Sequence, residues 1–223
     1  GNLFCGCIAI VEAFNGNIHI SAYLVGLAAV FDFLDGFAAR LLKVQSPMGK
    51  ELDSLADMVS FGLLPGIILY HLLLNLGDVL PSQYFAYVAF LIPIFSALRL
   101  ANFNIDTRQS DSFIGVPTPA VTLLIASFPL ICLEASSQAC LVINNIYFLV
   151  GITVLMSYLL VAELPLFALK FKDFTFENNK IRYIFIGVSV LLLVILHYVA
   201  LPIIIFLYIL ISIISNLMNS KNS

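Results

Sequence analysis

Long apolar runs separated by short polar stretches make up nearly the whole chain. The runs fall at about residues 1–14, 18–42, 52–76, 84–100, 117–133, 143–171, 183–199 and 202–218. A helix rises about 1.5 Å per residue, so a run of about 17–25 residues crosses the ~30 Å hydrocarbon core of a bilayer. The first run is too short to cross alone and the sequence does not begin with Met, so we expect a truncated first helix rather than a signal peptide. The pattern predicts an all-α polytopic transmembrane bundle of about eight spans.

Composition and the placement of charge support the same class. The chain is 61% hydrophobic and 10% charged, whereas a soluble domain is about half apolar and a quarter charged. All basic residues lie in alternate connections or in the tail, which predicts that these connections and the C-terminus face the cytoplasm. We therefore expect a multi-pass membrane protein, and we expect its functional residues in the cytoplasmic half. The basic residues are Arg40, Lys43, Lys50, Arg99, Arg108, Lys170, Lys172, Lys180, Arg182 and Lys221.

Two pairs of aspartates interrupt the second and third apolar runs. Asp32 and Asp35 are three residues apart, and Asp53 and Asp57 are four apart. Each spacing puts both carboxylates of a pair on one helix face. By helix rise, both pairs reach comparable depths, roughly 5–15 Å from the cytoplasmic edge.

Carboxylates in a bilayer need a compensating charge. Each costs about 2.5–3.5 kcal/mol at the bilayer centre, and four together repel one another unless a cation lies among them. Divalent cations prefer oxygen ligands, so the pattern predicts a site for two such ions. The alternative is that Arg40, Lys43 and Lys50, or helix N-termini, satisfy isolated acids. That alternative does not explain the double pairing.

The spacing of these residues resembles the signature of the CDP-alcohol phosphatidyltransferases. The matching segment is Asp32-x2-Asp35-Gly36-x2-Ala39-Arg40-x8-Gly49-x3-Asp53-x3-Asp57. The resemblance implies that Asp32, Asp35, Asp53 and Asp57 bind two divalent metals, Mg²⁺ or Mn²⁺. It implies that Gly36, Ala39, Arg40 and Gly49 hold the CDP part of a CDP-linked lipid. It further implies that Asp57 is the general base, and that the protein is a homodimer.

The residues after Asp57 carry a narrower resemblance, which concerns the acceptor alcohol. Met58-Val59-Ser60-Phe61-Gly62, together with segments 1–6, 99–104 and 113–119, resembles the phosphatidylserine synthase branch. The resemblance implies transfer of a phosphatidyl group from CDP-diacylglycerol to L-serine, which leaves CMP. Asn102 departs from the Arg-Leu-Ala-Arg-Phe-Asn form common in that branch.

Serine needs a fixed cation for its carboxylate. Arg99, at the end of the fourth run, is the first candidate and Arg108 the second. In the alternative, Arg99 only extends to the lipid head groups.

Other functions compete with this interpretation. The same chemistry with glycerol phosphate, inositol phosphate or choline is one alternative, although a phosphorylated acceptor favours several Lys or Arg around the cavity. An ion- or proton-coupled transporter also uses intramembrane acids, but it favours acids spread across the membrane and repeated halves.

The remaining expectations concern domains and cysteines. We expect a six-helix core at 1–171 and two additional helices at 172–223. Pro165 should kink the sixth helix, and Glu163 should be an intramembrane acid without an assigned role. Cys132 and Cys140 flank an outer loop, and we do not expect a disulfide between them. We expect Cys5 and Cys7 to be packing residues.

Overall fold

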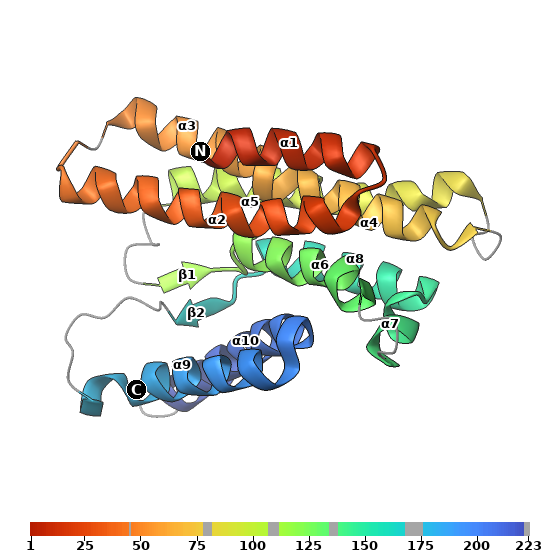
Figure 1. The fold of residues 1–223 in the computed structure, drawn as a ribbon. Helices are drawn as coiled ribbons and strands as arrows, with labels where there is room; N and C mark the ends of the chain where they lie inside the picture. Colours follow the sequence, from red (N-terminus) through yellow and green to blue (C-terminus); the bar gives the residue numbers. More distant parts are fainter. Residues whose placement is uncertain (45, 78–81, 107–111, 134–137, 168–175, 221–223) are drawn as a thin grey trace.

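The computed structural model describes residues 1–44, 46–77, 82–106, 112–133, 138–167 and 176–220. It is a bundle of helices with one pair of short strands (Figure 1). The elements are α1 (Asn2–Phe14), α2 (Ile18–Leu41), α3 (Pro47–Asp57), the π-helix η1 (Met58–Leu63), α4 (Leu64–Leu74), the 3₁₀-helix η3 (Gln83–Phe90), α5 (Leu91–Ile105), β1 (Ser112–Ile114), α6 (Thr118–Leu133), α7 (Gln138–Ile143), α8 (Ile146–Val161), β2 (Pro165–Phe167), α9 (Phe176–Leu196), the 3₁₀-helix η4 (His197–Val199) and α10 (Ala200–Ser220).

The predicted membrane bundle is confirmed. Within the described residues, four helical stretches are long and apolar enough to cross a membrane: Ile18–Leu41, Pro47–Leu74, Gln83–Ile105 and Arg182–Asn216. Asn2–Phe14, Thr118–Leu133 and Ile146–Val161 are shorter apolar helices. The last stretch doubles back near His197, where φ is +49°, so α9 and α10 form an antiparallel pair (Figure 1). The predicted domain boundary at 171/172 lies outside the described residues and stays a prediction.

Helix α6 is the centre of the core. Most of its residues are buried, including Val121, Leu124, Ile125 and Phe128. It packs against α2, α4 and α10. Helix α1 packs against α2 and η1 and buries a stripe of small residues that includes Gly6 and Ala9. At Gly6 the missing side chain lets α1 approach Ser60 of η1 closely. Cys5 lies in this stripe as expected, whereas Cys7 is exposed.

The predicted sixth helix, 143–171, is wrong at both ends. Helix α8 begins after Asn145, whose side chain accepts hydrogen bonds from the N–H groups of Tyr147 and Phe148, and it ends at Val161. Pro165 does not kink a helix but begins β2, which pairs antiparallel with β1. Glu163 consequently lies outside any helix, in the connection between α8 and β2, and is exposed; its location within the membrane stays a prediction.

The start of the third span also differs from the prediction. The third apolar run begins at about residue 52, whereas helix α3 begins at Pro47, directly after Ser46. The Ser46 hydroxyl oxygen accepts a hydrogen bond from the Gly49 N–H at 3.0 Å, and Pro47 occupies the first turn, where its missing N–H costs nothing. Helix α5 likewise continues to Ile105, so the segment after Arg99 is helical rather than a loop.

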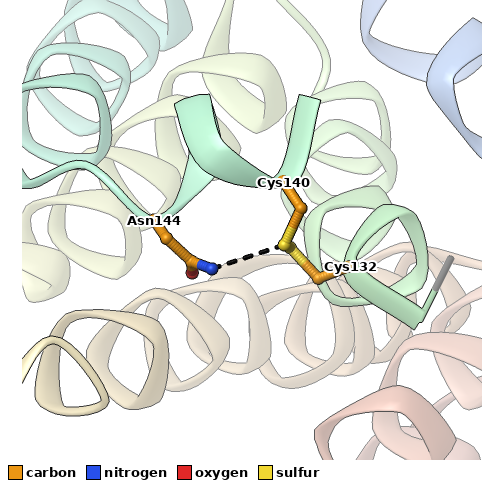
Figure 2. Close-up of a disulfide and its surroundings, with 3 residues drawn as sticks. All are labelled: Cys132, Cys140 and Asn144. Carbon is orange, nitrogen blue, oxygen red and sulfur yellow. Dashed lines mark hydrogen bonds between the residues drawn. A yellow bond between two sulfur atoms is a disulfide. The ribbon is translucent and has the colours of Figure 1, made fainter. Parts of the chain in front are cut away.

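A disulfide joins Cys132 to Cys140, contrary to our expectation (Figure 2). The short helix α7 folds back against the end of α6 and brings the two Cα atoms to 4.9 Å, inside the range that a disulfide bridges. The Asn144 side-chain amide donates to the Cys140 sulfur at 3.3 Å. In Figure 1 this end of the bundle lies opposite the junction of α2 and α3.

Gly115 fixes the connection between β1 and α6 against α8. Its φ is +79°, and its N–H donates to the Leu164 carbonyl at 2.9 Å. A Cβ at this position would lie 2.5 Å from the Leu160 carbonyl oxygen. Only glycine fits both the backbone conformation and the space.

We predict that Gly115→Ala lowers the stability of the protein by about 2 kcal/mol or more, because Ala is strained at positive φ and would clash with the α8 backbone. The apparent melting temperature of the detergent-solubilised protein measures this loss. Gly151→Ala in α8 is the matched control, since a Cβ there meets nothing within 4 Å. Equal melting temperatures for the two variants would contradict the proposed constraint.

Candidate metal centre and nucleotide cavity

The aspartates of the second and third spans come together at one end of the bundle, where α2 ends and α3 begins. One ligand oxygen from each of Asp32, Asp35 and Asp53 lies within 4.8 Å of the others. Asp57 lies beside them, since one amide donates to both Asp57 and Asp32. The structure thus brings together the two carboxylate pairs that the sequence placed on separate helices.

A π-helical segment directly after Asp57 sets the direction in which α3 continues. Pro65 has no N–H to donate to the Phe61 carbonyl four residues earlier, so the regular α-helical hydrogen bond cannot form. The Thr122 hydroxyl of α6 donates to that carbonyl at 2.8 Å instead. The π-helix, which begins one residue beyond Asp57, is therefore anchored to the core helix α6 through the Phe61 carbonyl.

Asn2 connects α1 to both aspartate-bearing helices. Its side-chain Nδ2 donates to Asp57 Oδ1 at 2.9 Å and to Asp32 Oδ1 at 3.3 Å. The Ser60 hydroxyl donates to the Asn2 backbone carbonyl at 3.2 Å, which fixes the end of α1 against η1.

The donor set fits a divalent cation. Asp32 is partly buried, and Asp35 and Asp53 are exposed at the mouth of a cavity, so their oxygens are accessible. Lys50 donates to the Asn104 backbone carbonyl at 3.1 Å, and within the described ranges no ion pair joins Lys50 or Arg40 to the aspartates. Carboxylate oxygens crowded together in this way favour a hard cation among them.

The residues assigned to CDP line the cavity beside this cluster. Its volume is about 890 Å³. A Cβ on Gly36 would meet nothing within 4 Å, so the α2 surface beside Asp35 is open to a ligand. The lining includes Asn2, Asp35, Gly36, Ala39, Arg40, Ser46, Gly49, Lys50 and Asp53.

Asn104 of α5 is hydrogen-bonded to α3. Its side-chain amide donates to the Ser54 hydroxyl at 3.0 Å, beside Asp53, and its backbone carbonyl accepts from Lys50. Sequence analysis placed Asn104 only within a segment of family resemblance. The contacts of Asn2 and Asn104 were not predicted. Asn2 is a single amide at the start of an apolar run, and Asn104 is the second of two amides after Arg99.

Arg99 does not line the aspartate cavity. It lines a second cavity of about 390 Å³ with Asn102, Asp106, Ile114, Val161 and Glu163. Arg99 is 5% exposed, and its guanidinium lies 5.5 Å from the centre of the Phe103 ring. A side chain extending to lipid head groups would be exposed, so the burial of Arg99 favours a role inside the protein. The second candidate, Arg108, lies outside the described residues.

Comparisons with known proteins identify relatives of similar sequence. The chain is 40% identical over 127 residues to a CDP-diacylglycerol–serine O-phosphatidyltransferase of Helicobacter pylori, covering 56% of this chain and 52% of that protein. It is 38% identical over 130 residues to the enzyme of that name from Bacillus subtilis, covering 57% and 71%. An archaetidylserine synthase of Methanothermobacter thermautotrophicus is 32% identical over 134 residues, covering 57% and 53%.

The matched region covers about half the length of the relatives from Helicobacter and Methanothermobacter. Residues 1–162 match the family described as CDP-alcohol phosphatidyltransferase. This range contains both aspartate pairs and every residue of the nucleotide cavity described above. The chain belongs to the CDP-alcohol phosphatidyltransferase family.

Proposed function

We propose that this protein transfers a phosphatidyl group from CDP-diacylglycerol to L-serine and releases CMP. The observation that carries the proposal is the meeting of the aspartates with Gly36, Ala39, Arg40 and Gly49 at one cavity. Such a cavity can take the CDP head group while the acyl chains remain in the bilayer. The names of the relatives from Helicobacter and Bacillus support serine as the acceptor.

We assign two divalent ions, Mg²⁺ or Mn²⁺, to Asp32, Asp35, Asp53 and Asp57. When bound, these ions neutralise the pyrophosphate and stabilise the negative charge of the leaving CMP. Arg40, in the last turn of α2, lines the cavity and would supply a further positive charge for the phosphates of the CDP group. Gly36 leaves room for the nucleotide against the helix backbone.

Asp57 is the proposed general base. It takes the proton of the acceptor hydroxyl as the oxygen attacks the β-phosphorus, and the bond to CMP breaks. Asp57 is partly buried, deeper than the exposed Asp35 and Asp53, which suits a proton acceptor shielded from bulk water.

The cavity around Arg99 is the proposed source of acceptor recognition. Arg99 would bind the serine carboxylate, and Asp106 and Glu163 supply negative charge on the same lining for the ammonium group. A phosphorylated alcohol would meet two carboxylates there, which disfavours glycerol phosphate and inositol phosphate.

The proposal includes an orientation in the membrane. The α2–α3 junction, which carries the aspartates together with Arg40, Lys43 and Lys50, lies at the end of the bundle opposite α7, which carries Cys140 of the disulfide (Figure 1). Disulfides persist in oxidising compartments, so this arrangement supports a cytoplasmic active site in a bacterial inner membrane. Following the family resemblance, we also propose a homodimer. A transporter is disfavoured because the acids cluster at one depth instead of crossing the membrane.

Purified protein supplied with CDP-diacylglycerol and Mn²⁺ or Mg²⁺ should release CMP with L-serine. Choline, inositol phosphate and glycerol phosphate should give far slower release. Chromatographic detection of CMP and of the lipid product measures both. Faster turnover with another alcohol would reject serine while keeping the reaction class, and no CMP with any alcohol would reject the transferase.

We predict that Asp57→Asn lowers kcat by about 100-fold or more, because the amide cannot accept the hydroxyl proton. Binding of CDP-diacylglycerol should change less, since Asp32, Asp35 and Asp53 remain. Asp53→Asn is the comparison variant, and it should weaken Mn²⁺ binding in addition to lowering kcat. Near-full activity of Asp57→Asn would assign the base to another group.

Arg99→Lys is expected to raise the KM for serine about tenfold or more, because a hydrogen bond to a charged group is worth about 1.5–3 kcal/mol. The KM for CDP-diacylglycerol should stay within about twofold, since Arg99 lies outside the nucleotide cavity. Lys43→Gln, an exposed basic residue beside α2, serves as the control. A serine KM equal to that of the unmodified protein would restrict Arg99 to packing.

A further inference from the structure

Asn2 is the one helix-α1 side chain for which the structure shows direct hydrogen bonds to the motif aspartates, among the described residues. It is 3% exposed, so its amide is shielded from water that would weaken these bonds. Asp32 and Asp57 are 30 and 55 residues away in sequence. The amide therefore ties together three helices at the point where the chemistry is proposed to occur.

The orientation of the amide follows from its partners. An ionised carboxylate only accepts hydrogen bonds, so the Asn2 side chain must present its NH₂ group to both aspartates. Its own Oδ1 is then buried and has no hydrogen-bond partner among the described residues. Leaving a buried carbonyl unsatisfied costs stability. The unsatisfied Oδ1 lowers the stability of the fold, while the two Nδ2 hydrogen bonds hold the carboxylates of Asp32 and Asp57 in a fixed relative position.

An amide suits this position better than a cation. A Lys or Arg beside Asp57 would neutralise the carboxylate that has to accept a proton. Asn2 carries no net charge and donates only to Oδ1 of Asp57, so the lone pairs of Oδ2 stay available to a metal ion and to the acceptor hydroxyl. Its second bond, to Asp32, ties the position of Asp57 to a member of the proposed metal cluster.

The end of α1 is itself held in place. The Ser60 hydroxyl donates to the Asn2 carbonyl, and a Cβ on Gly6 would lie 2.3 Å from the Ser60 oxygen, so α1 and η1 are in close contact. The Asn2 amide therefore lies on a helix that packs against η1, and not on a loop.

We propose that Asn2 is the positioning residue for the base: its amide fixes the Asp57 carboxylate relative to Asp32, and hence relative to the metal ligands. The inference rests on the proposed function, because it takes Asp57 as the base. Asn2 also lines the cavity assigned to the nucleotide, so the competing role is nucleotide binding, which would appear as a loss of affinity for the CDP-lipid.

The test combines steady-state kinetics with Mn²⁺ binding in the full chain. Asn2→Ala should lower kcat about 10- to 100-fold, since a hydrogen bond to a charged group is lost, while the KM for CDP-diacylglycerol stays within about twofold. Mn²⁺ affinity, followed by the loss of the free-ion EPR signal, should stay close to that of the unmodified protein. Asn17→Ala is the matched control, because Asn17 Nδ2 donates to the Glu12 carboxylate at 2.7 Å in the turn after α1.

A double-mutant cycle separates positioning from general stability. In the Asp57→Asn background, Asn2→Ala should cost less than about twofold in kcat, because the group that it positions no longer accepts a proton. Equal losses in both backgrounds would overturn the proposal. So would a raised KM for CDP-diacylglycerol at unchanged kcat, or a loss of Mn²⁺ affinity as large as that of Asp53→Asn.

Two further measurements cover other outcomes. If Asn2→Ala is not obtained folded, Asn2→Ser keeps a shorter donor and should show a smaller kcat loss with the same KM pattern. An experimental structure of the Mn²⁺-bound variant needs no turnover, and it should show the Asp57 carboxylate displaced from Asp32. An undisplaced Asp57 would refute the inference. If the unmodified protein uses another alcohol than serine, the kinetics are run with that alcohol, so the two proposals fail separately.

Discussion

Repulsion among the carboxylates at the junction of α2 and α3 is the constraint on which this end of the protein depends. Asp32, Asp35 and Asp53 lie close enough to share a cation, and bilayer helices offer little solvent to screen them. The surrounding structure prevents the two helices from separating. Asn2 donates to one member of each pair, and Asn104 holds α3 from the other side.

The core supports the site through an irregular helix. Pro65 removes a backbone hydrogen bond within the third span, and a lone irregularity in an apolar environment would leave the Phe61 carbonyl unsatisfied. Thr122 satisfies it from α6, most of whose residues are buried. Packing at the centre of the bundle therefore fixes the direction of the helix that carries Asp53 and Asp57.

Arg99 and Asn104 lie on different faces of α5, and of these two residues only Arg99 lines one of the two cavities. Arg99 and Asn104 are five residues apart, about 140° around the helix, and Asn104 faces α3 whereas Arg99 faces the end of α8. The β1–β2 pair, fixed by Gly115, lies beside the Arg99 cavity. In the proposed function, lipid substrate and acceptor are thus recognised by separate surfaces, which allows acceptor choice to change without altering the metal cluster.

Sequence alone determined the class of helical membrane bundle, the second span and the helix faces that carry the aspartates, because these follow from local periodicity within one helix. The residues assigned to CDP came from the family resemblance, and the ends of the third and sixth helices did not follow from the apolar runs. The second span was predicted at 18–42 and is observed at Ile18–Leu41. Contacts between distant segments were decided by the tertiary structure. Pro165 pairs with Ile114 across 51 residues, Cys132 meets Cys140 because α7 folds back, and Asn2 reaches Asp57 across the bundle. None of these partners lies within one helical turn or one strand repeat of the other, so no periodic pattern in the sequence could signal them.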